Sequence, residues 1–254
     1  MSVDDVGFLS LTHFCDKHGP KVLMVTQIAS DLDRCNELLL PEYPKDSYCD
    51  SCLLRLPEPK SDATSIRSSI DDFYSVSTQY SSIRYQLLSM IIKKTFSEET
   101  MSYDGSPFMF CDEHRGLNLA VGFKLEDVHA RGNERRYCLI LSLEKRNPCD
   151  GNDVFKTLSD NWQFIIESLS KLIDHIKIQA REQLNRRQTD FAQIMGGTYL
   201  RENKQKLPVS LADIVNDQLI FLRIHKWNTF ILTRLKAVQV ETVDSDGPKG
   251  AVKP

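Results

Sequence analysis

An arginine beside a glycine is the feature of this sequence whose residue types are best suited to chemistry on a phosphate. The stretch HARGNERRY, residues 129–137, leads into the apolar run CLILSL at 138–143, which is typical of a buried strand. Arg131 is followed by Gly132, which allows a partner to approach the backbone closely. A guanidinium is planar and permanently charged, so it can stabilise a phosphoryl group during transfer. A solvated loop arginine is the commoner case, and the residues alone leave both interpretations open.

Two cysteines, Cys49 and Cys52, have the spacing of half a tetrahedral zinc site. Cys35 or His18 would be needed to complete the ligand set. Because one C-x-x-C without a second pair is a weak signal, we expect free thiols here and no cofactor, with a structural zinc as the alternative. The pair does not stand between a strand and a helix, so thioredoxin-like redox chemistry is less favoured.

The rest of the sequence contains no recognisable catalytic set. The six histidines are dispersed, and neither a Walker-type phosphate loop nor a G-x-S-x-G elbow is present. A net charge of −3 argues against binding to nucleic acid or to an anionic membrane. The seven cysteines are odd in number and scattered, as is typical of reduced thiols. Together with an acidic N-terminus and no long apolar run, they predict a cytoplasmic protein.

The strands expected to position these residues form a hairpin and a meander. Residues 7–14 and 21–28 are strand-like and are joined by a short turn containing Gly and Pro. Three further runs, at 107–111, 117–125 and 136–143, are separated by hairpin-length links, which predicts an antiparallel meander. The sequence therefore predicts a five-stranded antiparallel sheet. One additional strand is plausible at 72–80, and residues 30–71 are predicted to be a flexible insertion because they are rich in proline, serine and acids.

Helices are predicted before and after the meander in the sequence. Leu87, Leu88, Ile91 and Ile92 have helical spacing, and a long amphipathic helix follows Asp150 and extends as far as Met195. Ser210 and Asp213 are typical of a cap for a second long helix over 210–235. The order predicts an α+β, longin-like fold in which helices cover one face of the sheet. We assign a longin domain to 1–182, a C-terminal helical extension to 183–238 and a loose tail to 239–254.

Three separated motifs, in order, resemble the folliculin family. His13, Phe14, Cys15, His18, Gly19 and Pro20 match its H-F-C-x-x-H-G-P opening, YCDSC at 48–52 matches its C-x-x-C, and FCDEHRG at 110–116 begins its meander. The family's A-R-G loop corresponds to Ala130, Arg131 and Gly132. The resemblance is strong over residues 7–146 and is a matter of pattern alone in the helices. The length resembles the longin-only fungal member, without the DENN-type domain of longer members.

This resemblance implies that the chain is a subunit of a GTPase-activating complex. The implied target is a Rag-type GTPase of the C/D class at the vacuole or lysosome, in amino-acid signalling to the TOR complex. The implied partner is a folliculin-interacting-type (Lst-type) longin/DENN subunit. Arg131 is the implied catalytic arginine, acting on the GTPase in trans, and Gly132 and Tyr85 are the implied GTPase contacts. The alternative is a non-catalytic longin scaffold that binds GTPases or traffic proteins through its sheet edge.

Overall fold

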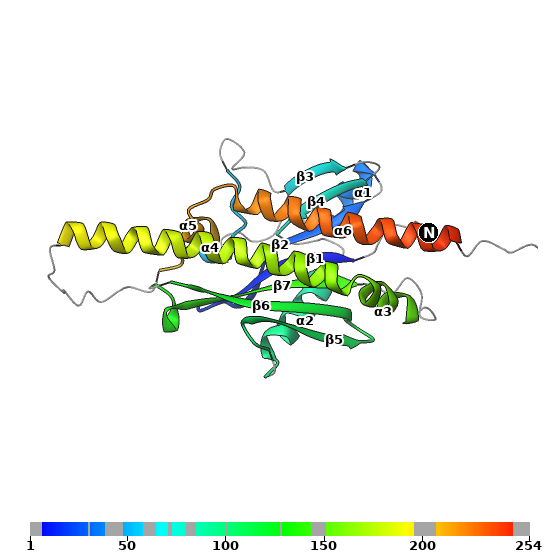
Figure 1. The fold of residues 1–254 in the computed structure, drawn as a ribbon, viewed down its shortest axis with the longest axis horizontal. Coiled ribbons are helices and arrows are strands. Elements are labelled where there is room, and N and C mark those ends of the chain that lie inside the picture. The colour runs from blue at the N-terminus through cyan, green and yellow to red at the C-terminus, as the bar shows by residue number, and fades with distance from the viewer. Residues whose placement is uncertain are drawn as a thin grey trace, which may run out of the picture.

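The computed structural model describes ten segments of the chain, which together form a sheet covered by helices (Figure 1). They are residues 7–29, 31–38, 48–57, 65–70, 73–79, 85–99, 101–127, 129–143, 151–195 and 207–245. None of the helices within these segments is both long enough and apolar enough to cross a membrane.

A hairpin and a meander form the centre of the sheet, as the sequence predicts. The hairpin consists of β1 (Phe8–Cys15) and β2 (Gly19–Ala29), and the meander of β5 (Asp104–Asp112), β6 (Gly116–Glu126) and β7 (Glu134–Leu143). Strand β1 also pairs with β7, with Phe14 opposite Arg136, and all pairs are antiparallel. The end of β1 and the start of β7 therefore lie side by side. The α+β, longin-like prediction is confirmed.

The sheet has seven strands, so the prediction of five is wrong. Strands β3 (Ser65–Ile70) and β4 (Phe73–Thr78) extend it beyond β2, which gives the order β3-β4-β2-β1-β7-β6-β5. Strand β4 is the additional strand that the sequence makes plausible. Strand β3 was missed because SIRSSI contains only two apolar residues, and it joins the sheet through backbone pairing with β4.

The insertion predicted to be flexible at 30–71 contains regular elements besides β3. Helix α1 (Leu32–Glu37) begins at an Asp31 cap, and a 3-10 helix, η2 (Asp50–Cys52), carries the C-x-x-C pair. Residues 39–47 and 58–64 of the insertion lie outside the described residues. The proline-rich composition of the insertion gave no sign of these elements, because they are held in place by pairing or packing with strands such as β2 and β4.

Helices cover both faces of the sheet, whereas the sequence predicts one covered face. Helix α2 (Tyr85–Ser97) packs on one face. The other is covered by α3 (Gly151–Asp160), α4 (Trp162–Met195), α5 (Leu211–Val215) and α6 (Ile220–Ser245). Figure 1 shows α4 and α6 running side by side across that face. Helix α4 crosses the proposed domain boundary at 182/183 without a break.

Each of the two predicted long helices is divided by a short break. The first is interrupted at Asn161, whose side-chain amide donates to the Thr157 carbonyl. The second begins at the predicted Ser210 cap and stops at Asn216, which has a left-handed φ of 53°. Asparagine tolerates this conformation, which ends a helix. The Asp217 carboxylate then accepts the Leu219 N–H, which allows α6 to start.

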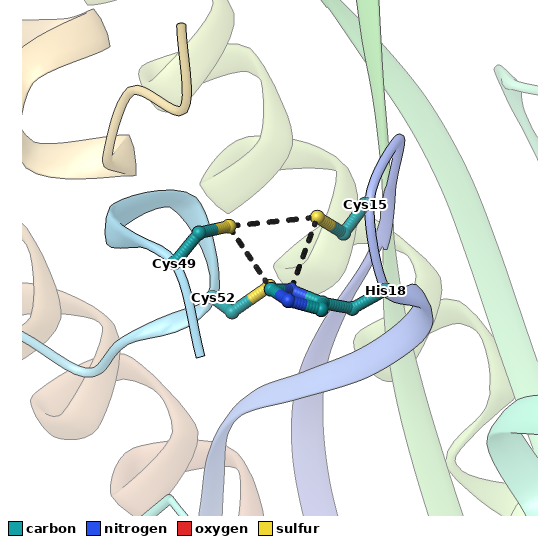
Figure 2. Close-up of side chains that lie close together, drawn as sticks. All are labelled: Cys15, His18, Cys49 and Cys52. Carbon is teal, nitrogen blue, oxygen red and sulfur yellow. Dashed lines mark hydrogen bonds between the residues drawn. The ribbon is translucent and has the colours of Figure 1, made fainter. Parts of the chain in front are cut away.

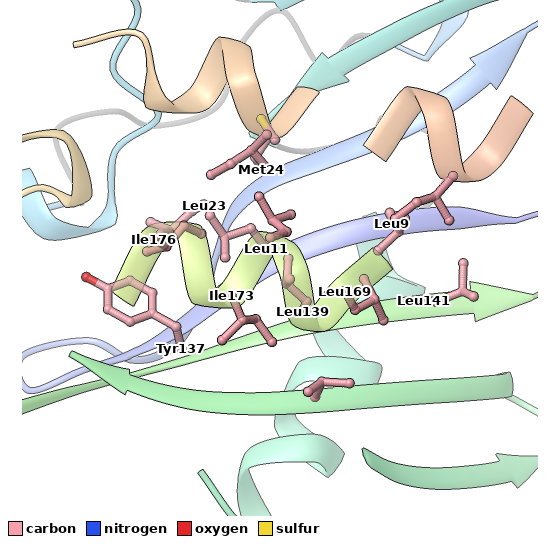
Figure 3. Packing of buried hydrophobic residues seen from close by; sticks show 14 of the residues in the cluster. Leu9, Leu11, Leu23, Met24, Tyr137, Leu139, Leu141, Leu169, Ile173 and Ile176 are labelled. Carbon is pink, nitrogen blue, oxygen red and sulfur yellow. The ribbon is translucent and has the colours of Figure 1, made fainter. Parts of the chain in front are cut away.

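Strand β7 shows how the alternation of side chains fills both layers of the core. Tyr137, Leu139 and Leu141 face α4 and α6, whereas Cys138 and Ile140 face α2. Figure 3 shows the first group packed with Leu169, Ile173 and Ile176 of α4 and with residues of β1 and β2. Burial of apolar side chains on both faces is the main stabilising term of the fold.

A buried polar network fixes α6 against β3 and β4. Both nitrogens of the His225 ring form hydrogen bonds with serine hydroxyls. Ser77 Oγ lies 2.7 Å from Nδ1, and Ser68 Oγ lies 2.9 Å from Nε2. Ser75 Oγ lies 2.8 Å from Thr229 Oγ1. Burial lowers the pKa of His225 to about 4, so the ring is neutral and bonds to hydroxyl groups. This histidine has a structural role.

Tyr137→Phe is expected to leave stability unchanged or to raise it by up to about 1 kcal/mol. The Tyr137 ring is fully buried, and its hydroxyl has no hydrogen-bond partner among the residues described. Removing a buried, unsatisfied hydroxyl removes a desolvation penalty and no bond. Urea unfolding would measure the change, with Leu139→Ala, expected to cost about 2–5 kcal/mol, as the reference for a true packing loss. A loss of more than 1 kcal/mol in Tyr137→Phe would contradict this.

Candidate functional site

The loop between β6 and β7 holds Arg131 out from the end of the sheet. Arg131 begins a 3-10 helix, η3 (Arg131–Asn133), and its side chain is exposed. None of the described residues accepts a hydrogen bond from the guanidinium or pairs with its charge. The group is therefore available to an anion supplied from outside the chain.

The backbone of this loop is held by its own hydrogen bonds. The Asp127 N–H donates to the Asn133 carbonyl at 2.9 Å, and the Ala130 N–H donates to the Asp127 carbonyl at 3.0 Å. The Asn133 N–H donates to the Ala130 carbonyl at 3.2 Å. Gly132 and Asn133 both have left-handed φ values, 72° and 59°. Glycine and asparagine are the residues that adopt this region most readily, so the sequence suits the turn.

A buried ion pair closes the base of the loop. The Arg135 Nε donates to Asp127 Oδ2, and both side chains are only 6% exposed. The other Asp127 oxygen accepts the His129 N–H at 3.0 Å, and a second Arg135 nitrogen donates to the Leu207 carbonyl at 2.9 Å. Asp127 and Arg135 thus join both ends of the loop to the segment that precedes α5.

The β1–β2 turn supports the loop from the side. The Arg131 N–H donates to Asp16 Oδ2 at 2.9 Å. Asp16 directly follows β1, whose end lies beside the start of β7 because those strands pair. The Asp16 carboxylate thus holds the backbone of Arg131, while the guanidinium of the same residue projects into solvent.

The third arginine of the cluster, Arg136, is exposed but engaged. Its Nε lies 3.2 Å from Glu134 Oε1, and its guanidinium stands over the Tyr103 ring at 5.2 Å. Hydrogen bonds from Lys124 and Arg136 hold the pKa of Glu134 below its usual range. Of the three arginines, Arg135 is structural, Arg136 is paired, and Arg131 alone is unengaged within the described part of the chain.

The two implied GTPase contacts lie in different places. Gly132 is in the loop, where a Cβ would meet no atom within 4 Å, so it is open to a partner. Tyr85 is the first residue of α2 and is 44% exposed. It is the far end of α2 that approaches the turns, because Phe96 contacts Phe14 of β1. Eleven residues of helix, about 16 Å, separate Phe96 from Tyr85. The structure does not bring Tyr85 beside Arg131.

A cluster of three thiols and one imidazole lies at the same turn (Figure 2). Cys15 and His18 come from the β1–β2 turn, and Cys49 and Cys52 come from η2. Their four ligand atoms all lie within 4.8 Å of one another. The sequence indicated His18 as a possible third member. It missed Cys15, although Cys15 and His18 form a C-x-x-H pair that complements the C-x-x-C. Cys35 instead lies on α1, buried in a separate apolar cluster with Ala29 and Val76.

The cluster favours a thiolate. A hydrogen bond from the Cys52 thiol, together with backbone N–H groups of Lys17 and His18, lowers the pKa of Cys15 far below its usual value. The same pairing and burial raise the pKa of Cys52. Thiolates bind soft metal ions, and this is the only group of ligating side chains found in the described segments that could hold one.

Comparison with known proteins gives two matches. Residues 73–235 match the family model named Folliculin, described as a vesicle coat protein involved in Golgi to plasma membrane transport. The chain is also 50% identical, over 232 residues, to Protein LST7 of Saccharomyces cerevisiae. That alignment covers 88% of this chain and 94% of the yeast protein. The family match includes the whole β5–β6–β7 meander and the Arg131 loop.

Proposed function

Because this chain belongs to the folliculin family, we propose that it is a subunit of a GTPase-activating complex that supplies Arg131 in trans. The target is a Rag-type GTPase of the C/D class, and the setting is amino-acid signalling to the TOR complex at the vacuolar or lysosomal membrane. The chain itself performs no complete reaction, since the nucleotide and its catalytic water belong to the GTPase.

The observation that carries the proposal is the contrast between the Arg131 backbone and its side chain. The backbone N–H is bonded to Asp16, and the loop is closed by the Asp127–Arg135 pair. The guanidinium, in contrast, is exposed and engages none of the described residues. A surface arginine that served stability would be expected to meet a carboxylate or a ring, as Arg136 does. Arg131 is instead positioned and left free.

This arrangement suits transition-state stabilisation of GTP hydrolysis. During attack by water on the γ-phosphoryl group, negative charge spreads over the transferred group and the leaving oxygen. A guanidinium placed there donates two parallel hydrogen bonds and contributes a fixed positive charge. Because the loop backbone is already held, its geometry is set before the GTPase docks, which is the condition for electrostatic stabilisation without reorganisation. Exposed Gly132 permits close approach of the partner at the next residue.

Single-turnover GTP hydrolysis tests the proposal. The assay compares a purified Rag-type heterodimer alone with the same heterodimer at saturating concentrations of the complex containing this chain. Acceleration in the second arm supports an activator. Binding without acceleration would overturn the proposal and favour the alternative of a non-catalytic scaffold.

We further propose that the complex is a heterodimer formed with a folliculin-interacting-type subunit along the β5 edge of the sheet. Exposed edges pair readily with other chains. Of the two outer strands, β5 presents the more apolar side chains, with Phe108, Met109 and Phe110 in sequence, and Met109 is 47% exposed.

Met109→Lys is expected to weaken the heterodimer at least tenfold, because a lysine on an edge strand opposes pairing with another strand. Ile70→Lys, on the opposite outer strand β3, is the matched control and should leave the dissociation constant unchanged. Analytical ultracentrifugation or a titration with labelled partner measures both. Equal effects of the two substitutions, or no association of the wild-type chains, would contradict the β5 assignment.

A further inference from the structure

We propose that Cys15, His18, Cys49 and Cys52 form a structural zinc site that joins the β1–β2 turn to the 3-10 helix of the insertion. The proposal concerns the stability and metal content of the chain alone and does not depend on its action on a GTPase. The four residues are contributed as two pairs with the same spacing, C-x-x-H at 15–18 and C-x-x-C at 49–52. Two such pairs are the common composition of a closed, four-coordinate zinc site.

The separations between the ligand atoms fit a tetrahedron around zinc. Zinc–sulfur and zinc–nitrogen bonds of about 2.3 and 2.0 Å predict edges of about 3.8 Å between sulfurs and about 3.5 Å between nitrogen and sulfur. Cys49 Sγ lies 3.6 Å from both Cys15 Sγ and Cys52 Sγ. His18 Nδ1 lies 3.7 Å from Cys15 Sγ and 3.4 Å from Cys52 Sγ. Figure 2 shows the four side chains converging from two separate segments on one point.

A disulfide explains this arrangement less well. Bonded sulfurs lie about 2.05 Å apart, whereas the sulfur separations given for Cys49 are both 3.6 Å. Cys49 is also equidistant from two other cysteines, so any one disulfide would leave a third thiol and an imidazole beside it without a role. Hydrogen bonds between thiols are too weak to account for four converging donors.

The surroundings supply the outer contacts that a zinc–thiolate centre needs. The Ser51 hydroxyl lies 3.7 Å from Cys15 Sγ and 3.0 Å from Cys49 Sγ. Donors of this kind offset the negative charge of thiolate ligands and orient them. Cys15 and Cys52 are buried, 3% and 0% exposed, while His18 and Cys49 lie nearer the surface, which leaves a route for the metal to enter.

The segment carrying the C-x-x-C is placed on the sheet by contacts that do not involve the metal. The Gln79 amide, at the end of β4, donates to the Cys52 carbonyl at 2.6 Å and accepts the Leu54 N–H at 3.2 Å. Arg55 pairs with Asp213 of α5 at 2.9 Å. Both halves of the site are thus held facing each other, so binding needs little rearrangement of the fold. The metal would then fix the turn that carries Asp16.

Metal analysis of the full-length chain, purified without added metal or a metal-binding tag, tests this site. We expect about one zinc per chain and no iron. Replacement by cobalt(II) is expected to give the visible absorption of a tetrahedral ion and a thiolate-to-cobalt charge-transfer band. Removal with a strong chelator should lower the thermal unfolding midpoint by at least about 5 °C, and added zinc should restore it. Less than a tenth of an equivalent of zinc in folded protein that also fails to bind cobalt would overturn the proposal.

Matched variants distinguish the cysteines that bind the metal from cysteines outside the cluster. Cys49→Ser/Cys52→Ser and Cys15→Ser are expected to lose the metal, whereas Cys35→Ser and Cys111→Ser, outside the cluster, should retain it. His18→Cys should retain zinc, and its cobalt charge-transfer band should increase with the fourth thiolate. If the cysteine variants do not fold, His18→Cys and the wild-type stoichiometry still decide the matter. Full zinc content in Cys49→Ser/Cys52→Ser, or a disulfide between these cysteines detected by mass spectrometry in freshly purified protein, would overturn the proposal.

Discussion

Arg131→Ala is expected to slow GTP hydrolysis in the assembled complex by roughly 10³–10⁵-fold at saturation, the usual contribution of an arginine supplied in trans. This corresponds to about 4–7 kcal/mol of transition-state stabilisation. The Arg131 side chain is exposed and buries no apolar surface, so folding and heterodimer assembly should be unchanged. Single-turnover hydrolysis, together with a binding measurement on the same GTPase, separates loss of catalysis from loss of docking.

Arg131→Lys should be nearly as defective, because an ammonium group cannot donate two parallel hydrogen bonds from a plane. Arg136→Ala is the matched control: this side chain is also an exposed arginine, but it is paired with Glu134 and lies over the Tyr103 ring. It should change the rate by less than about tenfold. Near wild-type acceleration by Arg131→Ala, with binding intact, would exclude Arg131 as the catalytic arginine and favour the scaffold function.

Arg135→Ala is expected to lower the free energy of unfolding by about 3–5 kcal/mol, because it leaves the buried Asp127 carboxylate without its cation. Both side chains are 6% exposed, so solvent cannot replace the missing partner. The lost hydrogen bond to the Leu207 carbonyl adds to the effect. Urea unfolding of the isolated chain measures the change. Arg131→Ala serves as the neutral reference in the same loop, because the Arg131 side chain pairs with no carboxylate among the described residues.

The double variant Asp127→Asn/Arg135→Gln should recover part of this loss. Two neutral groups in place of the ion pair remove the unpaired charge and keep the possibility of a hydrogen bond between them. If Arg135→Ala unfolds at the wild-type urea concentration, the ion pair does not support the loop. In that case Arg131 would owe its position to Asp16 and the backbone bonds alone.

Much of the fold could be predicted from side-chain periodicity. The β1–β2 hairpin, the meander and the Ser210 cap are local features, and each depends on a few neighbouring residues. Strand β3 could not be predicted in this way, because SIRSSI is polar and its strand conformation results from pairing with β4. The break at Asn216 was missed because the apolar pattern continues across it, while one left-handed residue ends the helix.

Of the candidate site around the β6–β7 loop, only Arg131 could be singled out from the sequence. Arg131 stands out through its neighbours and through the family resemblance, and the structure places it in an exposed loop. The supports of that loop, Asp16 and Asp127, are distant or unremarkable in sequence and become apparent only when β1 and β7 are paired. Likewise, Cys15 is 34 residues from Cys49, so the four-residue cluster needs the tertiary fold to be recognised. The catalytic role of Arg131 and the GTPase contacts of Gly132 and Tyr85 remain predictions.

In the proposed complex, the hydrogen bonds that hold the Arg131 turn reduce the conformational entropy that would be lost when the chain docks on the GTPase. Three backbone hydrogen bonds and the Asp16 contact already fix the turn in the free chain. Ordering even three backbone residues on binding would cost about 3–6 kcal/mol, whereas immobilising one arginine side chain costs about 2 kcal/mol. The difference remains available for stabilising the transition state. Loosening this turn would therefore slow hydrolysis even with every catalytic atom present.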